Sequence, residues 1–177
     1  HRAGPGVGGH CISVDPWFLV EMFPDHTPLI RAARNVNDGA PARVVSAVPA
    51  DVETVTLLGL AFKGNVDDCR ESPALTIASL LEASGRQVRI FDPLVKRPPV
   101  PTAGTLEAAV QGSDLLLLTT PHDLFAEIDP GSVALLARRR LLMDTHGFLD
   151  AERWRAAGFE VRQLGTGSFF EAGPAPG

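Results

Sequence analysis

The chain has 177 residues, of which 45% are hydrophobic, and its 16 basic and 21 acidic residues give a formal net charge of −5. A mildly acidic chain is a poor candidate for binding nucleic acid or a membrane surface, and no stretch reaches the roughly 18 apolar residues of a membrane span. Two cysteines and no visible signal peptide favour a reducing, cytoplasmic location. The length suits one domain, or one domain and part of another.

The N-terminal segment, residues 1–15, is rich in glycine and is expected to be a loop. It brings Cys11 to the end of the glycine run, and Asp15 follows four residues later. A backbone without side chains lets a substrate approach closely, and nearby N–H groups with a helix start at Pro16 can lower a thiol pKa. Cys11 is therefore a candidate nucleophile. The alternative is a structural glycine loop with a buried, inert cysteine.

The glycines at positions 4, 6 and 9 also match the dinucleotide-binding pattern G-x-G-x-x-G. That pattern requires a strand before it and a helix opening inside it. Only three residues precede Gly4, and the glycines run into His10 and Cys11. The context therefore argues against a dinucleotide fingerprint here.

Two helices are expected next. The first covers about 16–23, and the second covers about 28–48, with Thr27 as its cap and a weak point or kink at Gly39 and Pro41. The polar residues of the second helix are expected on its solvated face: Arg31, Arg34 and Asn35.

From residue 54 to residue 163, apolar strands alternate with helices. Strands are predicted at 54–60, 87–91, 114–119, 141–144 and 159–163, and helices at 73–84, 105–111, 131–138 and 150–157, with a loop and short helix at 121–127. Strand–helix–strand units require parallel strands, so the predicted fold class is α/β, a doubly wound parallel sheet of Rossmann-like type. The tail at 166–177 is rich in Gly, Pro and Ala and is expected to be flexible.

The loop after the first predicted strand, residues 59–73, is a candidate ligand site because ligands bind at the carboxyl ends of such strands. Phe62 beside Lys63 suits a base and a phosphate, and Arg70 can hold a phosphate or carboxylate in bidentate fashion. The alternative is an exposed loop whose acidic residues simply pair with Lys63 and Arg70. The residues alone leave both open.

Other reactive side chains carry weaker signals. His122 follows a strand and either faces the ligand end or is an ordinary loop histidine. Cys69 is expected to be a packing residue, and no Cys, His and Asp spacing matches a metal site. A thiol hydrolase that uses Cys11 is a weak alternative, because a convincing base is missing.

Two stretches resemble one known family. Gly-Val-Gly-Gly-His-Cys-Ile-x-Val-Asp-Pro-Trp-Phe at 6–18 resembles the catalytic-cysteine segment of the nucleotide-sugar 6-dehydrogenases, the UDP-glucose/GDP-mannose dehydrogenase superfamily. Ala-Phe-Lys-x-Asn-x-Asp-Asp-x-Arg-Glu-Ser-Pro at 61–73 resembles their second signature, and Asp92-Pro93 their third marker. Ser13 departs from the usual proline or alanine, and His146-Gly147 stands where UDP-glucose enzymes carry a substrate arginine.

The resemblance implies oxidation of the C6 hydroxyl of a UDP-sugar to a carboxylate with NAD⁺ used twice. Members that act on UDP-N-acetyl-D-mannosamine are most similar, and the UDP-N-acetylglucosamine and UDP-glucose enzymes are alternatives. Cys11 would form the covalent intermediates and Asp15 would polarise the water that releases the acid. The implied substrate contacts are Arg2, Gly4, Gly6, Val7, Gly8, His10, Phe62 and Lys63, and the implied NAD contacts are Cys11, Val14 and Arg70.

The resemblance also implies a domain arrangement. Residues 1–49 would be the catalytic loop and a central dimerisation helix, part of a middle domain, and residues 50–165 the UDP-binding domain. The start at His1 and the lack of an NAD-binding domain suggest a fragment of a longer protein, a homodimer through the linker helix. The competing interpretation is a non-catalytic module that binds UDP-sugars or dimerises.

Overall fold

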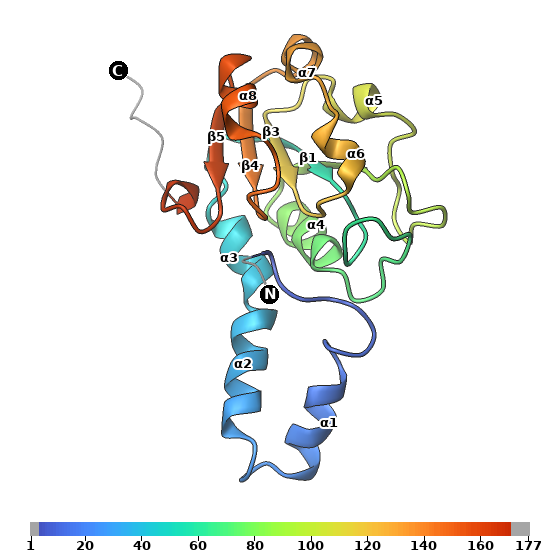
Figure 1. Ribbon diagram of the computed structural model, residues 1–177, viewed down its shortest axis with the longest axis vertical. Helices are drawn as coiled ribbons and strands as arrows, with labels where there is room; N and C mark the ends of the chain where they lie inside the picture. The colour runs from blue at the N-terminus through green and yellow to red at the C-terminus, as the bar shows by residue number, and fades with distance from the viewer. Residues whose placement is uncertain (1–3, 171–177) are drawn as a thin grey trace.

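The computed structural model describes residues 4–170 and contains one five-stranded sheet (Figure 1). The strands are β1 (Thr54–Leu58), β2 (Gln87–Phe91), β3 (Leu115–Leu118), β4 (Leu141–Asp144) and β5 (Glu160–Gln163). They lie in the order β2-β1-β3-β4-β5, and every pair is parallel. The predicted doubly wound parallel sheet is confirmed, with each strand within two residues of its expected position.

Helices cover both faces of this sheet. On one face, α3 (Ala40–Ser46) and α4 (Pro73–Ala83) share an apolar cluster with inward side chains such as Leu57 and Leu117. The other face is covered by α5 (Leu106–Val110), α6 (Asp123–Ala126), α7 (Pro130–Leu136) and α8 (Ala151–Ala156). Successive strand residues alternate between the two clusters, as a pleated strand requires, so Leu57 faces α4 and Leu58 faces the opposite layer.

Two further helices, α1 (Asp15–Met22) and α2 (Pro28–Asp38), form a hairpin that projects away from the sheet (Figure 1). The expected long helix at 28–48 is divided into α2 and α3 at Gly39, because Pro41 has no N–H to continue the ladder. Thr27 stands at the N-cap of α2, but its hydroxyl donates to the Phe23 carbonyl (2.8 Å) instead of capping the helix. The predicted position of the cap is therefore confirmed, and its predicted function as a cap is wrong.

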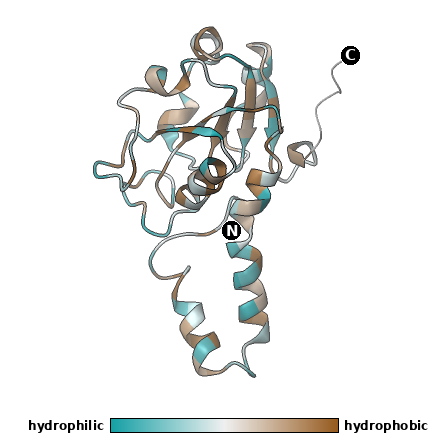
Figure 2. Cartoon of the chain, turned by 180° about the vertical axis from the view of Figure 1, so that it is seen from behind, coloured by the Kyte–Doolittle hydropathy of each residue, from teal (hydrophilic) through white to brown (hydrophobic). Residues whose placement is uncertain are grey.

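Figure 2 shows hydrophobic residues, in brown, on both helices of the hairpin, and several of them are exposed to solvent. The exposed large hydrophobic residues here are Ile12, Phe18, Leu19, Met22, Phe23, Leu29 and Val36. Several exposed apolar side chains in and beside one helical hairpin are typical of a surface that another protein segment covers.

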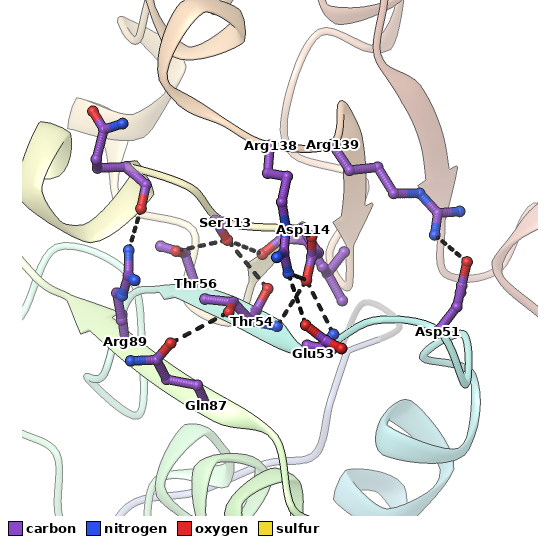
Figure 3. A network of polar contacts seen from close by, with 12 residues as sticks. Asp51, Glu53, Thr54, Thr56, Gln87, Arg89, Ser113, Asp114, Arg138 and Arg139 are labelled. Atoms are coloured by element: carbon purple, nitrogen blue, oxygen red, sulfur yellow. Dashed lines mark hydrogen bonds and ion pairs between the residues drawn. The ribbon is translucent and has the colours of Figure 1, made fainter.

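A polar network closes the amino ends of the strands (Figure 3). The carboxylate of Asp114 accepts the backbone N–H groups of Glu53 (3.0 Å) and Thr54 (2.9 Å) and pairs with Arg138. The Arg138 guanidinium, with the help of these N–H groups, lowers the pKa of Asp114 to about 2. Arg139 pairs with Asp51 at 3.0 Å beside it. This edge is engaged in structural contacts, and the carboxyl edge is the one available to a ligand.

The segment after β5 differs from the sequence-based expectation. Residues Ser168–Phe170 form a short 3₁₀ turn, and Phe169 is completely buried in the cluster beneath α3 and α4. The expected flexible tail at 166–177 therefore does not hold for these residues, because one aromatic side chain anchors them to the core. Residues 171–177 lie outside the described residues.

Candidate functional site

The strand order places a topological switch point between β1 and β3. The connection after β1 leads to β2 on one side, and the chain after β3 continues to β4 on the other. Ligands of doubly wound sheets bind where two such connections diverge. Here these connections are residues 59–72 and 119–122, and the first of them carries Phe62 and Lys63.

The glycine loop that carries Cys11 packs directly on this switch point. A Cβ atom at Gly8 would lie 2.3 Å from the Glu71 carbonyl oxygen, 2.8 Å from Pro73 Cδ and 3.1 Å from Phe62 Cβ. Only a residue without a side chain allows this approach. The glycine loop and the loop after β1 are thus neighbouring walls of one site, although more than fifty positions separate them in the sequence.

An asparagine of α2 fastens the glycine loop. Asn37 Oδ1 accepts the Val7 N–H (2.7 Å), and its Nδ2 donates to the Val7 carbonyl oxygen (3.2 Å). The amide therefore satisfies both backbone groups of Val7, as a neighbouring strand would do. Sequence reasoning missed Asn37, since nothing local marks a contact across thirty positions.

The predicted exposure of Arg34 is wrong. It was expected on the solvated face of its helix, but the residue is only 7% exposed. Its guanidinium donates to the Ile12 carbonyl oxygen (3.4 Å) and pairs with Asp38, which also accepts the Trp17 indole N–H (3.3 Å). Arg34 thereby ties α2 to the segment that carries Cys11. Its two companions, Arg31 and Asn35, are exposed as expected.

Cys11 and Asp15 lie at the start of α1. The Cys11 carbonyl oxygen accepts the backbone N–H groups of Val14 (3.0 Å) and Asp15 (2.8 Å), so the cysteine sits in the turn that opens the helix. The Cys11 thiol is free and exposed, so the alternative of a buried cysteine is wrong. Cys11 and Asp15 line the same surface depression of about 490 Å³, where Phe18 and Leu19 supply apolar walls.

A larger cleft, of about 790 Å³, runs between the glycine loop, α2 and the loop after β1. Most of the predicted substrate-binding residues line it, namely Gly4, Gly6, Val7, Gly8, Phe62 and Lys63. His10 is exposed but is not among its walls, and Arg2 lies outside the described residues. A smaller pocket of about 150 Å³ adjoins the cleft and shares Phe62, Lys63 and His146 with it.

His146 follows β4 and adds a polar group to both cavities. Its Nε2 lies 3.2 Å from the Thr119 carbonyl oxygen, which can only accept, so the proton resides on Nε2. Burial lowers the pKa of His146, which keeps the imidazole neutral near pH 7. The ring therefore offers a neutral acceptor, Nδ1, beside both cavities.

Arg70 lies on the exposed rim of the site. Its side chain is 65% exposed and holds Asp68 in bidentate fashion, with Nε 3.0 Å from Oδ1 and Nη2 2.6 Å from Oδ2. This bond is the main reason why the pKa of Asp68 falls to about 2 and why the pKa of Arg70 rises.

The two remaining candidates, His122 and Cys69, make structural contacts. His122 is completely buried and bonded, so it neither faces the ligand nor behaves as a plain loop histidine. Cys69 is half-buried against the core cluster, as expected of a packing residue. Within residues 4–170, no group of three or more His, Cys, Asp or Glu is arranged to hold a metal ion. No helix of this part of the chain is long and apolar enough to cross a membrane.

Family models identify the class of protein to which this fold and site belong. The model of the UDP-glucose/GDP-mannose dehydrogenase family, UDP binding domain, matches residues 56–151, and the model of its central domain matches residues 1–39. The chain belongs to the UDP-glucose/GDP-mannose dehydrogenase family.

Individual relatives narrow the similarity further. The chain is 38% identical to a UDP-N-acetyl-D-mannosamine dehydrogenase of Methanocaldococcus jannaschii, over 94% of this chain and 40% of the relative. It is 40% identical to the enzyme of the same name from Salmonella typhimurium, over 82% of this chain and 38% of the relative. The solved UDP-D-ManNAc dehydrogenase of Pyrococcus horikoshii superposes with a TM-score of 0.83 at 31% identity, over 95% of this chain and 41% of that one. The chain thus spans about two-fifths of the length of these relatives.

Proposed function

We propose that this chain supplies the catalytic cysteine and the UDP-binding site of a nucleotide-sugar 6-dehydrogenase that converts UDP-N-acetyl-D-mannosamine to its uronic acid. The observation that carries the proposal is the contact of Gly8 with Phe62 and Pro73, which joins the cysteine loop to the loop at the switch point. The relatives named for this activity support the choice of substrate.

The cleft suggests how the nucleotide binds. Phe62 offers an aromatic face for the uracil ring, and the exposed Lys63 offers a cation for the diphosphate. The neutral His146 adds a hydrogen-bond acceptor beside them. The sugar would extend along the glycine loop toward Cys11, with Arg2 and His10 contributing to its pocket. Gly4, Gly6 and Gly8 line the cleft, so their backbone would lie beside the sugar.

NAD⁺, when bound, would supply the hydride acceptor for two successive oxidations at C6. Between them the Cys11 thiol adds to the C6 aldehyde: the sulfur bonds to C6, and the thiol proton passes to the carbonyl oxygen. After the second oxidation C6 is held to Cys11 as a thioester. Asp15 would then take a proton from water as that water attacks C6, and cleavage of the C–S bond would release the carboxylic acid and the Cys11 thiolate. The acid would lose its proton to solvent, and the proton held by Asp15 would return the thiolate to the thiol.

The residues near Cys11 fit a dinucleotide. Arg70 exposes most of its guanidinium, which matches a pyrophosphate in charge and shape, and it would exchange its surface bond with Asp68 for that ligand. Val14 is half-buried directly after the cysteine turn and offers an apolar contact. We therefore propose Cys11, Val14 and Arg70 as the NAD-facing residues of this chain.

The arrangement of the longer protein follows from the same reasoning. Residues 1–49 would belong to a middle domain and residues 50–165 would form the UDP-binding domain. The exposed apolar side chains of α1 and α2 support a homodimer through this hairpin and the adjoining helix. The two free thiols suit a reducing cytoplasm.

The proposal is tested by Cys11→Ser in the complete gene product. With UDP-N-acetyl-D-mannosamine and NAD⁺, this variant should lose net NADH production, while calorimetry should show unchanged UDP affinity. Cys69→Ser is the matched control and should keep turnover, because Cys69 packs against the core. Full turnover by Cys11→Ser would rule out the cysteine mechanism, and failure of the unchanged protein to bind UDP would rule out the nucleotide site.

A further inference from the structure

A buried histidine links the connections on both sides of the switch point. His122 is 0% exposed, and its Nε2 lies 3.0 Å from Asp92 Oδ2. Its Nδ1 accepts the backbone N–H of Asn65 at 2.9 Å. The Asn65 N–H can only donate, so the imidazole carries its proton on Nε2 and donates it to Asp92. Both ring nitrogens are therefore committed to structural bonds.

These bonds hold the Lys63 segment at both ends. Before it, Asp92 Oδ2 accepts the backbone N–H groups of Leu60 (2.6 Å) and Ala61 (3.1 Å). After it, Asn65 is bonded to His122 through its N–H, and its Oδ1 accepts the Asp123 N–H (2.9 Å). Asn65 also has a positive φ of 62°, a conformation that costs energy and persists only where contacts fix it.

The Asp92 carboxylate at the centre is well satisfied. Burial alone would raise its pKa, but the bond from His122 and the backbone N–H groups of Leu60, Leu94 and Val95 bring the pKa well below its usual range. The carboxylate is thus ionised near pH 7 and offers a fixed acceptor to His122. One ionised group therefore anchors Leu60 directly and Asn65 through the imidazole.

The two connections also touch through their backbones. A Cβ atom at Gly64 would lie 2.3 Å from the Pro121 carbonyl oxygen, so the chain beside Lys63 lies directly against the segment that carries His122. Thr120 Oγ1 donates to the Ala61 carbonyl oxygen at 2.7 Å on the same side. The conformation of the Phe62–Lys63 turn is therefore set by the segment that follows β3.

We propose that His122 is the positioning residue of the nucleotide site: its bond to Asn65 holds the turn in which Phe62 and Lys63 face the cleft. This inference rests on the proposed binding of UDP to those two residues. His122 has no contact with the ligand in this account. Its effect on affinity is transmitted through the backbone of Asn65.

Two amide substitutions separate the bonds of the imidazole. In His122→Asn, the amide oxygen takes the position of Nδ1 and can still accept the Asn65 N–H. In His122→Gln, the amide nitrogen takes the position of Nε2 and can still donate to Asp92, but the Asn65 N–H loses its partner. Val133→Ala serves as the stability control, because Val133 is buried in α7 and belongs to the cluster on the other face of the sheet from α4.

The experiment measures UDP affinity by calorimetry and amide hydrogen exchange at Asn65 in the 177-residue chain, with thermal unfolding to show that each variant is folded. His122→Gln should exchange at Asn65 at least about tenfold faster and bind UDP about tenfold more weakly, the effect of losing one hydrogen bond. His122→Asn should keep an exchange rate at Asn65 and a UDP affinity close to those of the unchanged chain. Val133→Ala should lower the stability and leave the UDP affinity unchanged.

Each other outcome has a definite meaning. If His122→Gln is folded and binds UDP as tightly as the unchanged chain, His122 does not position the nucleotide site. If the affinity falls equally in both amide variants and in Val133→Ala, the effect is one of stability, and the inference is equally wrong. If neither the unchanged chain nor the complete gene product binds UDP, the proposed nucleotide site itself is refuted, whatever the exchange at Asn65 shows.

Discussion

Replacement of Lys63 by alanine should weaken UDP binding without destabilising the protein. Lys63 is exposed at the cleft, and none of the ion pairs among residues 4–170 includes it. Surface substitutions of this kind usually change the free energy of unfolding by less than about 0.5 kcal/mol. A charged hydrogen bond to a phosphate contributes about 1–3 kcal/mol, so the dissociation constant should rise by about 5- to 150-fold.

The assay is calorimetric titration of UDP at two salt concentrations. Higher salt should weaken binding to the unchanged chain more than binding to the variant, since the lost contact is ionic. Arg139→Ala is the matched control: it removes the same charge at the amino edge of the sheet, where Arg139 pairs with Asp51, and should leave the affinity unchanged. Equal affinities for Lys63→Ala and the unchanged chain would remove Lys63 from the site.

Three further predictions concern the contacts that hold the fold together. Asn37→Ala removes the partner of both backbone groups of Val7. It should therefore lower the free energy of unfolding by about 1–3 kcal/mol and speed amide exchange in the glycine loop. Unchanged amide exchange would show that Asn37 does not hold this loop. Phe169→Ala should cost about 3–5 kcal/mol, measured by urea unfolding, because the ring is completely buried; a loss below about 1 kcal/mol would show that the segment is not anchored. Asp114→Asn tests a pH dependence: the pKa of Asp114 falls to about 2 on folding, so its ionised form stabilises the protein above the unfolded-state pKa, and this contribution disappears as the pH falls toward about 2. The variant should therefore be less stable than the unchanged chain by about 1–2 kcal/mol at pH 7, a figure that allows for solvent screening at the half-exposed Arg138. Near pH 2 the two proteins should be equally stable. A difference in stability that persists near pH 2 would show that ionisation of Asp114 is not its cause.

The elements of the fold could be predicted because their signals are local. Ser72 before Pro73 marks the start of α4, and the Ser72 hydroxyl does accept the Ala74 N–H. The leucine run of β3 lies fully buried between two layers, as a central parallel strand requires. Alternation of strands and helices was enough to indicate a parallel sheet, and the loop after β1 was correctly placed at its carboxyl edge.

The supports of the site could not be predicted because they join distant positions. Asn37 and Val7, or His122 and Asn65, have no shared pattern in the sequence, and only the folded chain brings them together. Arg34 is charged and would be expected in solvent, yet the segment that carries Cys11 packs against α2 and buries it. Local polarity predicts exposure only where no other segment crosses the same face.

The most direct test of one shared site is protection of Cys11 from alkylation. Iodoacetamide labelling of the 177-residue chain would be followed by mass spectrometry at increasing UDP-N-acetyl-D-mannosamine, with half-buried Cys69 as the internal reference. The account predicts that labelling of Cys11 slows in proportion to occupancy, that UDP alone protects less because it lacks the sugar, and that Lys63→Ala shifts protection to higher concentrations. Unchanged labelling of Cys11 with the sugar nucleotide bound would show that the cysteine and the nucleotide site are separate.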